Sequence, residues 1–435
     1  FLLLTDFPDA PEQEMPTDED LLRRTVMGVR NLNATYGEAG RPIFHLLHRP
    51  RLWNEAEGCW MGRERKRGKL TELNRVLRGK EPEAFSTVVG DIDVLRTCRY
   101  VIPLDTDTDL PPGSAASMIG SMAHPLNRPI TDPETGCVDE GFGVLQPRVG
   151  IRLTGAGRSL FARLYAGEVG IDPYTREVSN VYHDLFARGQ FIGKGIYDIE
   201  AFHQSVGGRF PPNRILSHDL IEGCHAHCGF LNDVELVEDH PSRYLADVNR
   251  RHRWVRGDWQ IAAWLLPWVP SSDGNRVRNP LDRLSRWWIF DNLRRSLVPI
   301  ALLVLLVGGW LALPQLQPAW TIWVLAIYLA PDVLRTLWAT LVKPPKILWA
   351  AHLRREALAA GRQLVLSVLH LAFLPFEAIV HLDAIARVAW RVLVSKRRLL
   401  EWMTAHAAEV KARTGLRTIV REMWISPVVA LAAGA

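Results

Sequence analysis

Residues 1 to about 270 alternate short apolar runs with longer segments of mixed polarity. The apolar runs that predict strands include FLLLTDF, YVIPLD and GVLQPRV, and the helix-like segments include DEDLLRRTVMGVRNLNATYG and KRGKLTELNRVLRG. Strands that alternate with helices are typical of an α/β domain with a mostly parallel sheet. Because ligands bind at the carboxyl ends of such strands, the segment LDTDTD at one strand end is the first candidate site.

The pattern changes after Pro280. Residues 271–295 include most of the aromatic and basic segment LDRLSRWWIFDNLRRSLVP and predict a helix at a membrane interface. Residues 296–314 carry no charge, and as a helix they would cover roughly 28 Å, close to the hydrocarbon thickness of a bilayer. A second apolar run follows a short turn, so residues 296–341 predict a transmembrane hairpin, with a pair of buried helices as the alternative.

Basic residues flank the outer ends of this hairpin. Arg294 and Arg295 precede it, Lys343 and Lys346 follow it, and the turn between the two runs carries no charge. By the positive-inside rule, both ends and the α/β domain are expected in the cytoplasm.

The remaining segments predict further contact with the bilayer. Residues 342–420 have the pattern of amphipathic, interfacial helices, and residues 421–435 are the candidate start of another transmembrane helix. The chain begins at Phe1 inside a strand-like run, so we expect a fragment of a longer protein whose first strand lies upstream.

Composition narrows the class of protein. A chain of 435 residues predicts two or more units, and 48% hydrophobic with 23% charged residues argues against disorder. A net charge of +5 suits a nucleic acid, a membrane surface or an anionic substrate, but no nucleic-acid-reading motif is recognisable. Five scattered cysteines indicate reduced thiols, and CHAHC at residues 224–228 lacks the second ligand pair of a structural zinc site.

Three carboxylates, Asp105, Asp107 and Asp109, alternate with threonines directly after an apolar run. An EF-hand is excluded, because Leu110 and Ala116 stand where that loop needs Gly and Glu. A phosphatase of the haloacid dehalogenase type matches only in part. In a nucleotide-sugar transferase, a D-x-D pair holds Mg²⁺ or Mn²⁺ against the donor's diphosphate. A solvated acidic turn is the remaining alternative.

Sugar transfer also requires a base and cationic or aromatic groups near the leaving nucleotide. ILSHDLIEG places Asp219 at a strand-to-helix junction, and RRHRWVRGDWQ places Arg250 and Arg253 beside Trp254. FIGKG places Gly193 in a glycine-flanked loop. The alternatives are a helix N-cap for Asp219 and a lipid-facing patch for the basic run.

The order of these motifs resembles the processive family 2-like glycosyltransferases, which include cellulose synthases. The sequences of the individual motifs are more similar to the glycosyltransferase domain of bacterial cyclic β-1,2-glucan synthases. The segments that carry this resemblance are AHPLNRP, EGFGVLQPRV, GIDPYTR, FIGKGIYD, GGRFPPNRILSHDLIEGCHA, RRHRWVRGDWQ and FDNLRRSLVP. It extends from Phe1 through the hairpin and, less distinctly, to the C-terminus.

The resemblance implies a GT-A-like, Rossmann-related fold for residues 1–270 and an inverting enzyme of the bacterial inner membrane. Its donor would be UDP-glucose, its acceptor a growing β-1,2-glucan that family members start on the protein itself, and its cofactor Mg²⁺ or Mn²⁺. A phosphorylase-like domain is expected outside this sequence. A non-catalytic membrane scaffold with a transferase fold is the alternative.

On the donor side, the resemblance assigns the metal to Asp107, with Asp105 on the metal or the ribose. Asp6 is expected near the uridine, Lys66 near the donor nucleotide, and Gly193 in contact with substrate.

On the acceptor side, the resemblance makes Asp219 the general base on the acceptor's 2-hydroxyl. Arg253 would face the diphosphate and Trp254 the acceptor sugar. Arg250 stands where the motif has glutamine, and His218 stands where the wider superfamily has glutamate.

Overall fold

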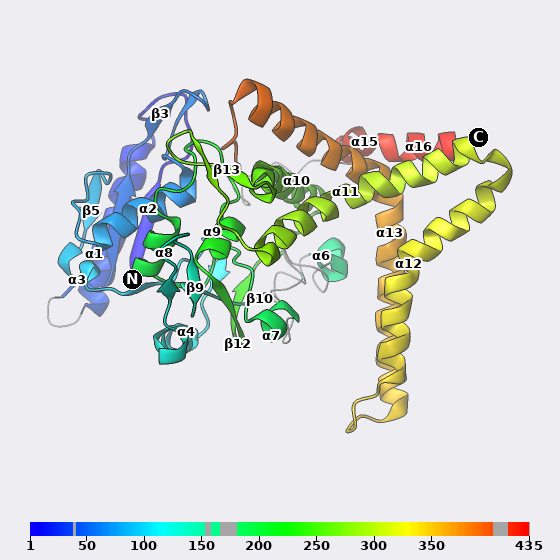
Figure 1. Ribbon diagram of the computed structural model, residues 1–435, viewed down its shortest axis with the longest axis horizontal. Helices are drawn as coiled ribbons and strands as arrows, with labels where there is room; N and C mark the ends of the chain where they lie inside the picture. The colour runs from blue at the N-terminus through cyan, green and yellow to red at the C-terminus, as the bar shows by residue number, and fades with distance from the viewer. Residues whose placement is uncertain (38–40, 153–156, 158, 166–180, 403–415, 435) are drawn as a thin grey trace.

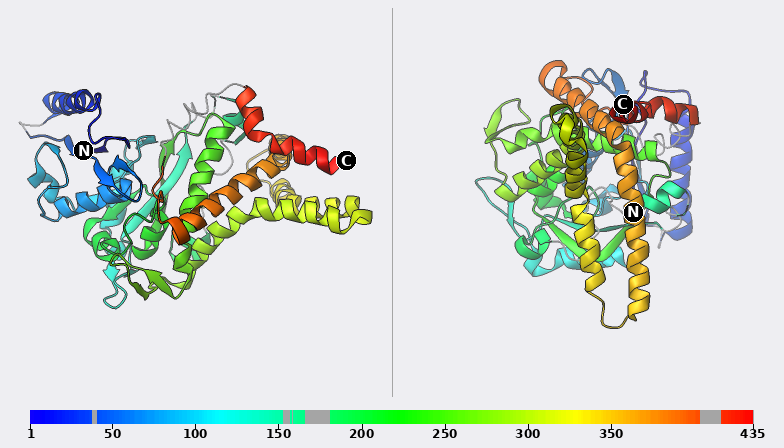
Figure 2. Two further views of the ribbon diagram at one scale, coloured as in Figure 1. Left: turned by 90° about the horizontal axis from the view of Figure 1, so that it is seen from above. Right: turned by 90° about the vertical axis from the view of Figure 1, so that its right-hand side faces the viewer.

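The computed structural model describes residues 1–37, 41–152, 157, 159–165, 181–402 and 416–434. An α/β unit formed by the N-terminal part of the chain lies beside an arm of long helices (Figure 1). The N-terminus lies in the α/β unit and the C-terminus among the helices, as the turned views also show (Figure 2). The GIDPYTR segment, residues 170–176, lies outside the described residues.

A three-stranded sheet forms the N-terminal part of the unit. Its order is β1 (Leu2–Asp6), β2 (His45–Arg49) and β5 (Thr87–Val89). The pair β1–β2 is parallel and β2–β5 is antiparallel. Because β1 and β2 run parallel, a crossover is needed between them, and α1 (Asp18–Tyr36) supplies it.

A five-stranded sheet follows, and its central pair is again parallel. Its order is β6 (Tyr100–Val101), β11 (Ile196–Asp198), β10 (Val144–Ile151), β12 (Cys228–Glu238) and β7 (Thr108–Asp109). Only β10–β12 pairs in parallel here, and the other three pairings are antiparallel.

The predicted α/β class is confirmed, but the single, mostly parallel sheet is corrected to two mixed sheets. The antiparallel members are the short strands of two or three residues that flank each parallel pair. Hydrophobic alternation reveals that a strand exists, whereas strand direction depends on which neighbour it pairs with. The direction of such short strands was therefore not readable from the sequence.

Short hairpins and helices complete the unit. The hairpins are β3 (Leu52–Asn54) with β4 (Cys59–Met61), β8 (Ile130–Thr131) with β9 (Val138–Glu140), and β13 (Trp268–Pro270) with β14 (Arg276–Arg278). The helices are α2 (Arg65–Leu77), α3 (Ile92–Arg96), α4 (Ser114–Ala123), α6 (Leu160–Tyr165), α7 (Val181–Phe186), α8 (Ile199–Val206), α9 (Asp219–His225) and α10 (Tyr244–Gln260). Short 3₁₀ turns span Pro125–Asn127, Ala262–Leu265 and Pro314–Leu316, and a π turn spans Arg391–Ser395.

One apolar core joins both sheets to the start of the helical arm. Leu47 of β2, Val144 of β10, Ile221 of α9 and Trp288 belong to the same buried cluster. Trp288 is only 1% exposed although it lies in the segment predicted to be interfacial. Truncating such a buried Trp to Ala typically costs about 3–5 kcal/mol, so this contact firmly docks the arm on the α/β unit.

The arm consists of α11 (Arg283–Ala312), α12 (Gln317–Leu341) and α13 (Trp349–Trp390), followed by α15 (Leu416–Met423) and α16 (Ile425–Gly434). Within the described residues, the first three are long and apolar enough to cross a membrane. Two of them coincide with the predicted hairpin. The third, α13, lies where interfacial helices were predicted.

The structure differs from the single interfacial helix that was predicted for residues 271–295. The β13–β14 hairpin occupies the start of residues 271–295, and the rest of that segment is continuous with the first apolar run in α11. Figure 1 shows that α13 bends, and Pro375, which has no backbone N–H to donate, lies inside it.

Candidate active site

Asp105 of the D-x-D pair lies between two lysines. Lys66, in the first turn of α2, places its Nζ 2.6 Å from Asp105 Oδ1, and Lys194 places its Nζ 3.4 Å from Oδ2. Burial favours the neutral acid, but both ammonium groups outweigh it and hold the pKa of Asp105 below its ordinary value. Each oxygen of this carboxylate therefore already faces a positive charge.

Lys194 was not among the predicted residues, although it belongs to the quoted FIGKG loop. Its side chain is 5% exposed and also pairs with Glu238 at the end of β12. Burial disfavours the ammonium, but Glu238 and Asp105 outweigh this and raise the pKa of Lys194. The sequence did carry a signal for Lys194, because it lies in an apolar, glycine-flanked loop. A lysine buried in such a loop needs carboxylate partners, which indicates a nearby acidic site.

The register of the five-stranded sheet brings Glu238 to the D-x-D segment. Strand β7 pairs with β12 so that Thr108 stands opposite Glu238, and the Thr108 hydroxyl donates to Glu238 Oε1 at 3.1 Å. Residues 130 positions apart thus meet, and no local pattern of the sequence could reveal it.

The other two aspartates of the cluster differ from Asp105. Asp109 forms an exposed ion pair with Arg152, whose Nε lies 3.0 Å from Asp109 Oδ2. Asp107 is exposed, and within the described part of the chain it has no hydrogen bond or salt bridge. Asp107 is therefore the carboxylate of this cluster that is most available to a ligand.

Gly193 connects the D-x-D segment to Asp219. Its carbonyl oxygen accepts a hydrogen bond from Lys66 Nζ at 2.9 Å, and its φ of +86° suits glycine. A Cβ at this position would lie 2.5 Å from Asp219 Oδ1, so a side chain would displace that carboxylate. Gln146 of β10 holds the loop in place, since its Oε1 accepts the N–H of Ile192 at 3.0 Å.

Asp219 is the first residue of α9. His218 occupies the cap position and no side chain caps this helix, so the alternative of Asp219 as an N-cap does not hold. The side chain of Asp219 is 30% exposed, yet its Oδ1 is buried without a hydrogen-bond partner. This oxygen is therefore free to accept a hydrogen bond from a water or a ligand.

His218 and Glu222 flank Asp219 and are both buried. His218 Nδ1 lies 2.8 Å from Glu222 Oε2 and 3.5 Å from Asp219 Oδ1. Burial opposes a charge on the imidazole, but Glu222 and Asp219 outweigh it and raise the pKa of His218. One ligand atom from each of these three residues lies within 4.8 Å of the others, close enough for a cation, but the hydrogen bond to Glu222 already engages Nδ1.

Asp6 lies at the carboxyl end of β1, as predicted for a ligand-binding position. Arg49 of β2 binds it with two hydrogen bonds, of 2.8 Å and 3.0 Å, and Lys69 Nζ lies 3.5 Å away. Gly62 allows the close approach, since a Cβ there would lie 2.6 Å from the carboxylate. The role of Asp6 near a uridine stays a prediction.

Helix α10 carries the predicted basic and aromatic residues on a half-buried face. Arg250 binds Asp247 at 2.7 Å and stacks on Trp254, with Cζ 4.7 Å from the ring centroid. Burial and neighbouring arginines lower the pKa of Arg253 to about 10, while Asp105 and Asp107 act in the opposite direction. The negative field of the D-x-D segment therefore reaches Arg253.

Helix α10 also packs against the segment that precedes Asp219. The N–H of Leu216 donates to Gln260 Oε1 at 2.7 Å. A Cβ on Gly257 would lie 2.3 Å from that of Ser217, so only glycine allows this contact. The basic face and Asp219 are thereby held in one arrangement.

A segment that follows α13, residues 398–402, crosses the edge of the site, and we call it the strap. Leu399 and Leu400 are buried, and Trp402 lies under two cationic groups. Cζ of Arg253 is 5.6 Å from the Trp402 ring centroid, and Cζ of Arg65 is 5.9 Å from it. Sequence reasoning missed Trp402, because its partners lie far from it along the chain.

The backbone carbonyls of the strap bind side chains from separate elements. Leu399 accepts from Gln260 at 2.7 Å, Leu400 accepts from Arg65, and Glu401 accepts from Arg256 at 3.0 Å. The strap thus ties α2 to α10.

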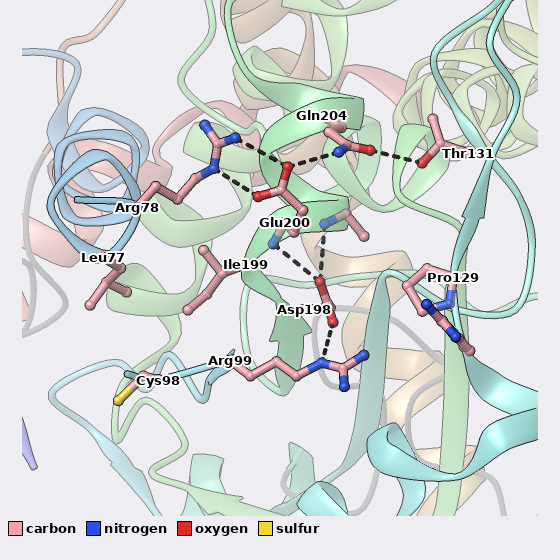
Figure 3. A pocket seen from close by; sticks show the side chains of 12 residues that line it. Leu77, Arg78, Cys98, Arg99, Pro129, Thr131, Asp198, Ile199, Glu200 and Gln204 are labelled. Carbon is pink, nitrogen blue, oxygen red and sulfur yellow. Dashed lines mark hydrogen bonds and ion pairs between the residues drawn. The ribbon is translucent and has the colours of Figure 1, made fainter. Parts of the chain in front are cut away.

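A cavity of about 540 Å³ lies elsewhere on the α/β unit (Figure 3). Four of its charged side chains form two ion pairs, since Arg78 binds Glu200 at 2.9 Å and Arg99 binds Asp198 at 3.2 Å. Asp198 also accepts the N–H groups that begin α8. The cavity shares none of the predicted residues, and its ion pairs have a structural role.

Asp107 is the carboxylate of the D-x-D segment that could hold a divalent cation, with water as its other ligands. Mg²⁺ and Mn²⁺ prefer carboxylate oxygens and keep several waters, which an exposed carboxylate permits. Asp105 fits less directly, because each of its oxygens faces a lysine. Its assignment as a metal ligand stays a prediction.

Fold and site together define an α/β protein in which acidic and basic side chains gather around the D-x-D segment, joined to helices long enough to cross a membrane. No family model matches the chain. The chain is 40% identical to the cyclic β-(1,2)-glucan synthase NdvB of Rhizobium meliloti (strain 1021). The alignment is 439 residues long, gaps included, and covers 99% of the chain. The chain is therefore a relative of the cyclic β-glucan synthases, as its motifs predicted. It spans 15% of the length of that protein.

Proposed function

We propose that the chain is an inverting glucosyltransferase unit that uses UDP-glucose to elongate a β-1,2-glucan. The main support is a continuous set of contacts from the D-x-D segment to the proposed base. Lys66 binds both Asp105 and the carbonyl of Gly193, and Gly193 lies against Asp219. Donor-binding and proton-accepting groups are thus held together.

On the donor side, Lys66 and Arg253 supply positive charge for the diphosphate, and Lys194 holds Asp105 in place. A divalent ion at Asp107 would neutralise part of the charge that develops on the leaving UDP. The desolvated guanidinium of Arg253 is suited to this task, because it already experiences the fields of Asp105 and Asp107.

On the acceptor side, Asp219 accepts the proton of the attacking hydroxyl group. The acceptor oxygen forms a bond to the anomeric carbon as the bond to UDP breaks. One displacement of this kind converts the α-linked donor into a β-linked product, with no covalent intermediate on the enzyme. Trp254, with Arg250 stacked on it, provides an aromatic face of the kind that sugars pack against.

The proposed setting is the inner membrane of a bacterium, with residues 1–270 as a cytoplasmic GT-A domain. The three long apolar helices support this setting, and the mixed sheets are compatible with that fold. We also propose the glucan acceptor, carried on the protein itself, and a phosphorylase-like domain as partners outside these residues.

The decisive experiment is UDP release from UDP-glucose by the purified protein in detergent or lipid nanodiscs, with Mg²⁺, Mn²⁺ or EDTA. We expect metal-dependent release together with a glucan that a β-1,2-specific glucanase digests. A folded protein without turnover would favour the scaffold, and a product resistant to that enzyme would reject the linkage.

A further inference from the structure

Two buried histidines, one at the N-cap and one in the last turn of α9, have opposite surroundings. His225 is 2% exposed, its Nδ1 donates to the carbonyl of Ile221 at 2.7 Å, and burial lowers its pKa to about 4. His218, 5% exposed, faces two carboxylates instead. A neutral histidine therefore lies within α9, whereas the histidine at its N-cap, next to the proposed base, has surroundings that favour a charge.

We propose that His218 and Glu222 form a buried pair that positions Asp219, with His218 as an imidazolium between the two carboxylates. This inference rests on the proposed function, in which Asp219 is the base. His218 touches no reacting atom and acts only through Asp219, so it is a positioning residue.

The geometry assigns different tasks to the two contacts of Nδ1. At 2.8 Å from Glu222 Oε2, Nδ1–H donates a charge-assisted hydrogen bond that fixes the ring. At 3.5 Å from Asp219 Oδ1, the interaction is electrostatic, and it lies on the side of the carboxylate that has no hydrogen-bond partner. Because Oδ1 is buried, the exposed part of the Asp219 side chain includes its other oxygen, Oδ2. That oxygen is the one that can meet an acceptor.

The remaining surroundings of His218 are consistent with a charge there. Besides Asp219 and Glu222, the charged group that acts on it is Arg67 of α2, which opposes the charge. Arg67 is itself paired with Glu64, so its opposing effect is reduced. Helix α10 meets the preceding residue, Ser217, with an uncharged glycine.

The test compares His218→Asn with His225→Asn in the full-length protein. The asparagine amide can occupy the place of Nδ1 and donate to Glu222, but it carries no charge. We expect His218→Asn to lower kcat about tenfold, less than the roughly 10²- to 10⁴-fold expected for loss of the base itself, with KM for UDP-glucose within about twofold. The acid limb of its pH profile should move to higher pH, because the cation facing the carboxylate is gone.

His225→Asn serves as the matched control, since it removes a comparably buried histidine from the helix that His218 precedes. Its pH profile should keep the wild-type acid limb, even if the protein becomes less stable. An unshifted limb in His218→Asn, or the same shift in both variants, would overturn the inference.

A second readout does not depend on sugar transfer. In protein labelled with ¹⁵N-histidine, the signal lost in His218→Asn identifies His218, which should be an imidazolium near neutral pH. Glu222→Gln should lower its titration midpoint. A neutral His218 at pH 6 would reject the inference, whatever the activity. A charged His218 in a protein that does not turn over UDP-glucose would reject the proposed function alone.

Discussion

Asp105 and Asp219 belong to the same candidate site but have opposite surroundings. Asp105 has a lysine on each oxygen, and one of these lysines is buried and held by Glu238. Asp219 has a buried oxygen with no hydrogen-bond partner, and the imidazole of His218 lies 3.5 Å from it. A single loop, Gly193–Lys194, touches both carboxylates.

We infer from the proposed function that the difference separates a binding position, Asp105, from a reactive one, Asp219. A carboxylate saturated by two ammonium groups is fixed and is a poor proton acceptor, which suits the positioning of a ligand. A buried oxygen left unsatisfied typically costs about 1–3 kcal/mol, and a fold keeps such a group where it has a task. The comparison therefore predicts that substitutions at the two positions affect different measured quantities.

The largest effect is expected at Asp219. Asp219→Asn preserves the shape of the side chain and removes its ability to accept a proton. Transfer should fall by roughly 10²- to 10⁴-fold, the range for loss of a general base, while UDP-glucose affinity stays near that of the wild type. Single-turnover kinetics and calorimetry measure the two quantities. A near-normal rate would remove Asp219 from the base role.

Lys194 should have the next largest effect, and mainly on stability. Lys194→Met leaves Asp105 and Glu238 facing each other without the buried ammonium, and breaking a buried pair in this way costs about 3–5 kcal/mol. Thermal unfolding of the full chain measures it. Combining the variant with Glu238→Gln should restore part of the loss, and strictly additive losses would contradict the pairing.

Trp402 is expected to have an intermediate effect on donor affinity. Its ring is shared by Arg65 and Arg253, and a cation–π contact of this kind is worth about 0.5–2 kcal/mol. Trp402→Leu should raise KM for UDP-glucose roughly 2- to 30-fold with a smaller change in kcat. Trp53→Leu, another exposed Trp of the α/β unit, is the control. A fall in kcat alone would argue against a donor-side role.

The smallest effect is expected at Asp109. Its exposed pair with Arg152 is the kind that contributes little, so Asp109→Asn should leave transfer within about twofold of the wild type. Asp107→Asn, two positions earlier, is the matched comparison and should abolish the response to Mg²⁺ or Mn²⁺. If both substitutions had the same effect on metal-dependent transfer, Asp107 would have no role that Asp109 lacks, and its assignment to the metal would be wrong.

The parts of this site that could be predicted have local signals. Asp105 and Asp6 follow apolar strands, Asp219 begins a helix, and Arg253 with Trp254 forms a compact motif. Resemblance to a family then assigned their roles.

The parts that could not be predicted depend on distant contacts. Glu238 reaches the site through the register of β7 on β12, and Trp402 reaches it from beyond α13. Periodicity identifies an element and its buried face, but register and docking are set by packing between elements. Lys194 lies between these cases, because its loop was recognised but its burial was not.

The strap limits where the chain can be divided in truncated or chimeric proteins. Although the predicted boundary of the α/β unit falls near residue 270, its surface is completed by Leu399 and Leu400, which bind to α10 and α2. A protein truncated before α11 would keep the proposed base and the D-x-D pair. It would lose Trp402 and expose the surface that Leu399 and Leu400 cover. Chimeras between relatives should therefore exchange residues 398–402 together with the N-terminal unit, because the smallest transferable module is discontinuous in sequence.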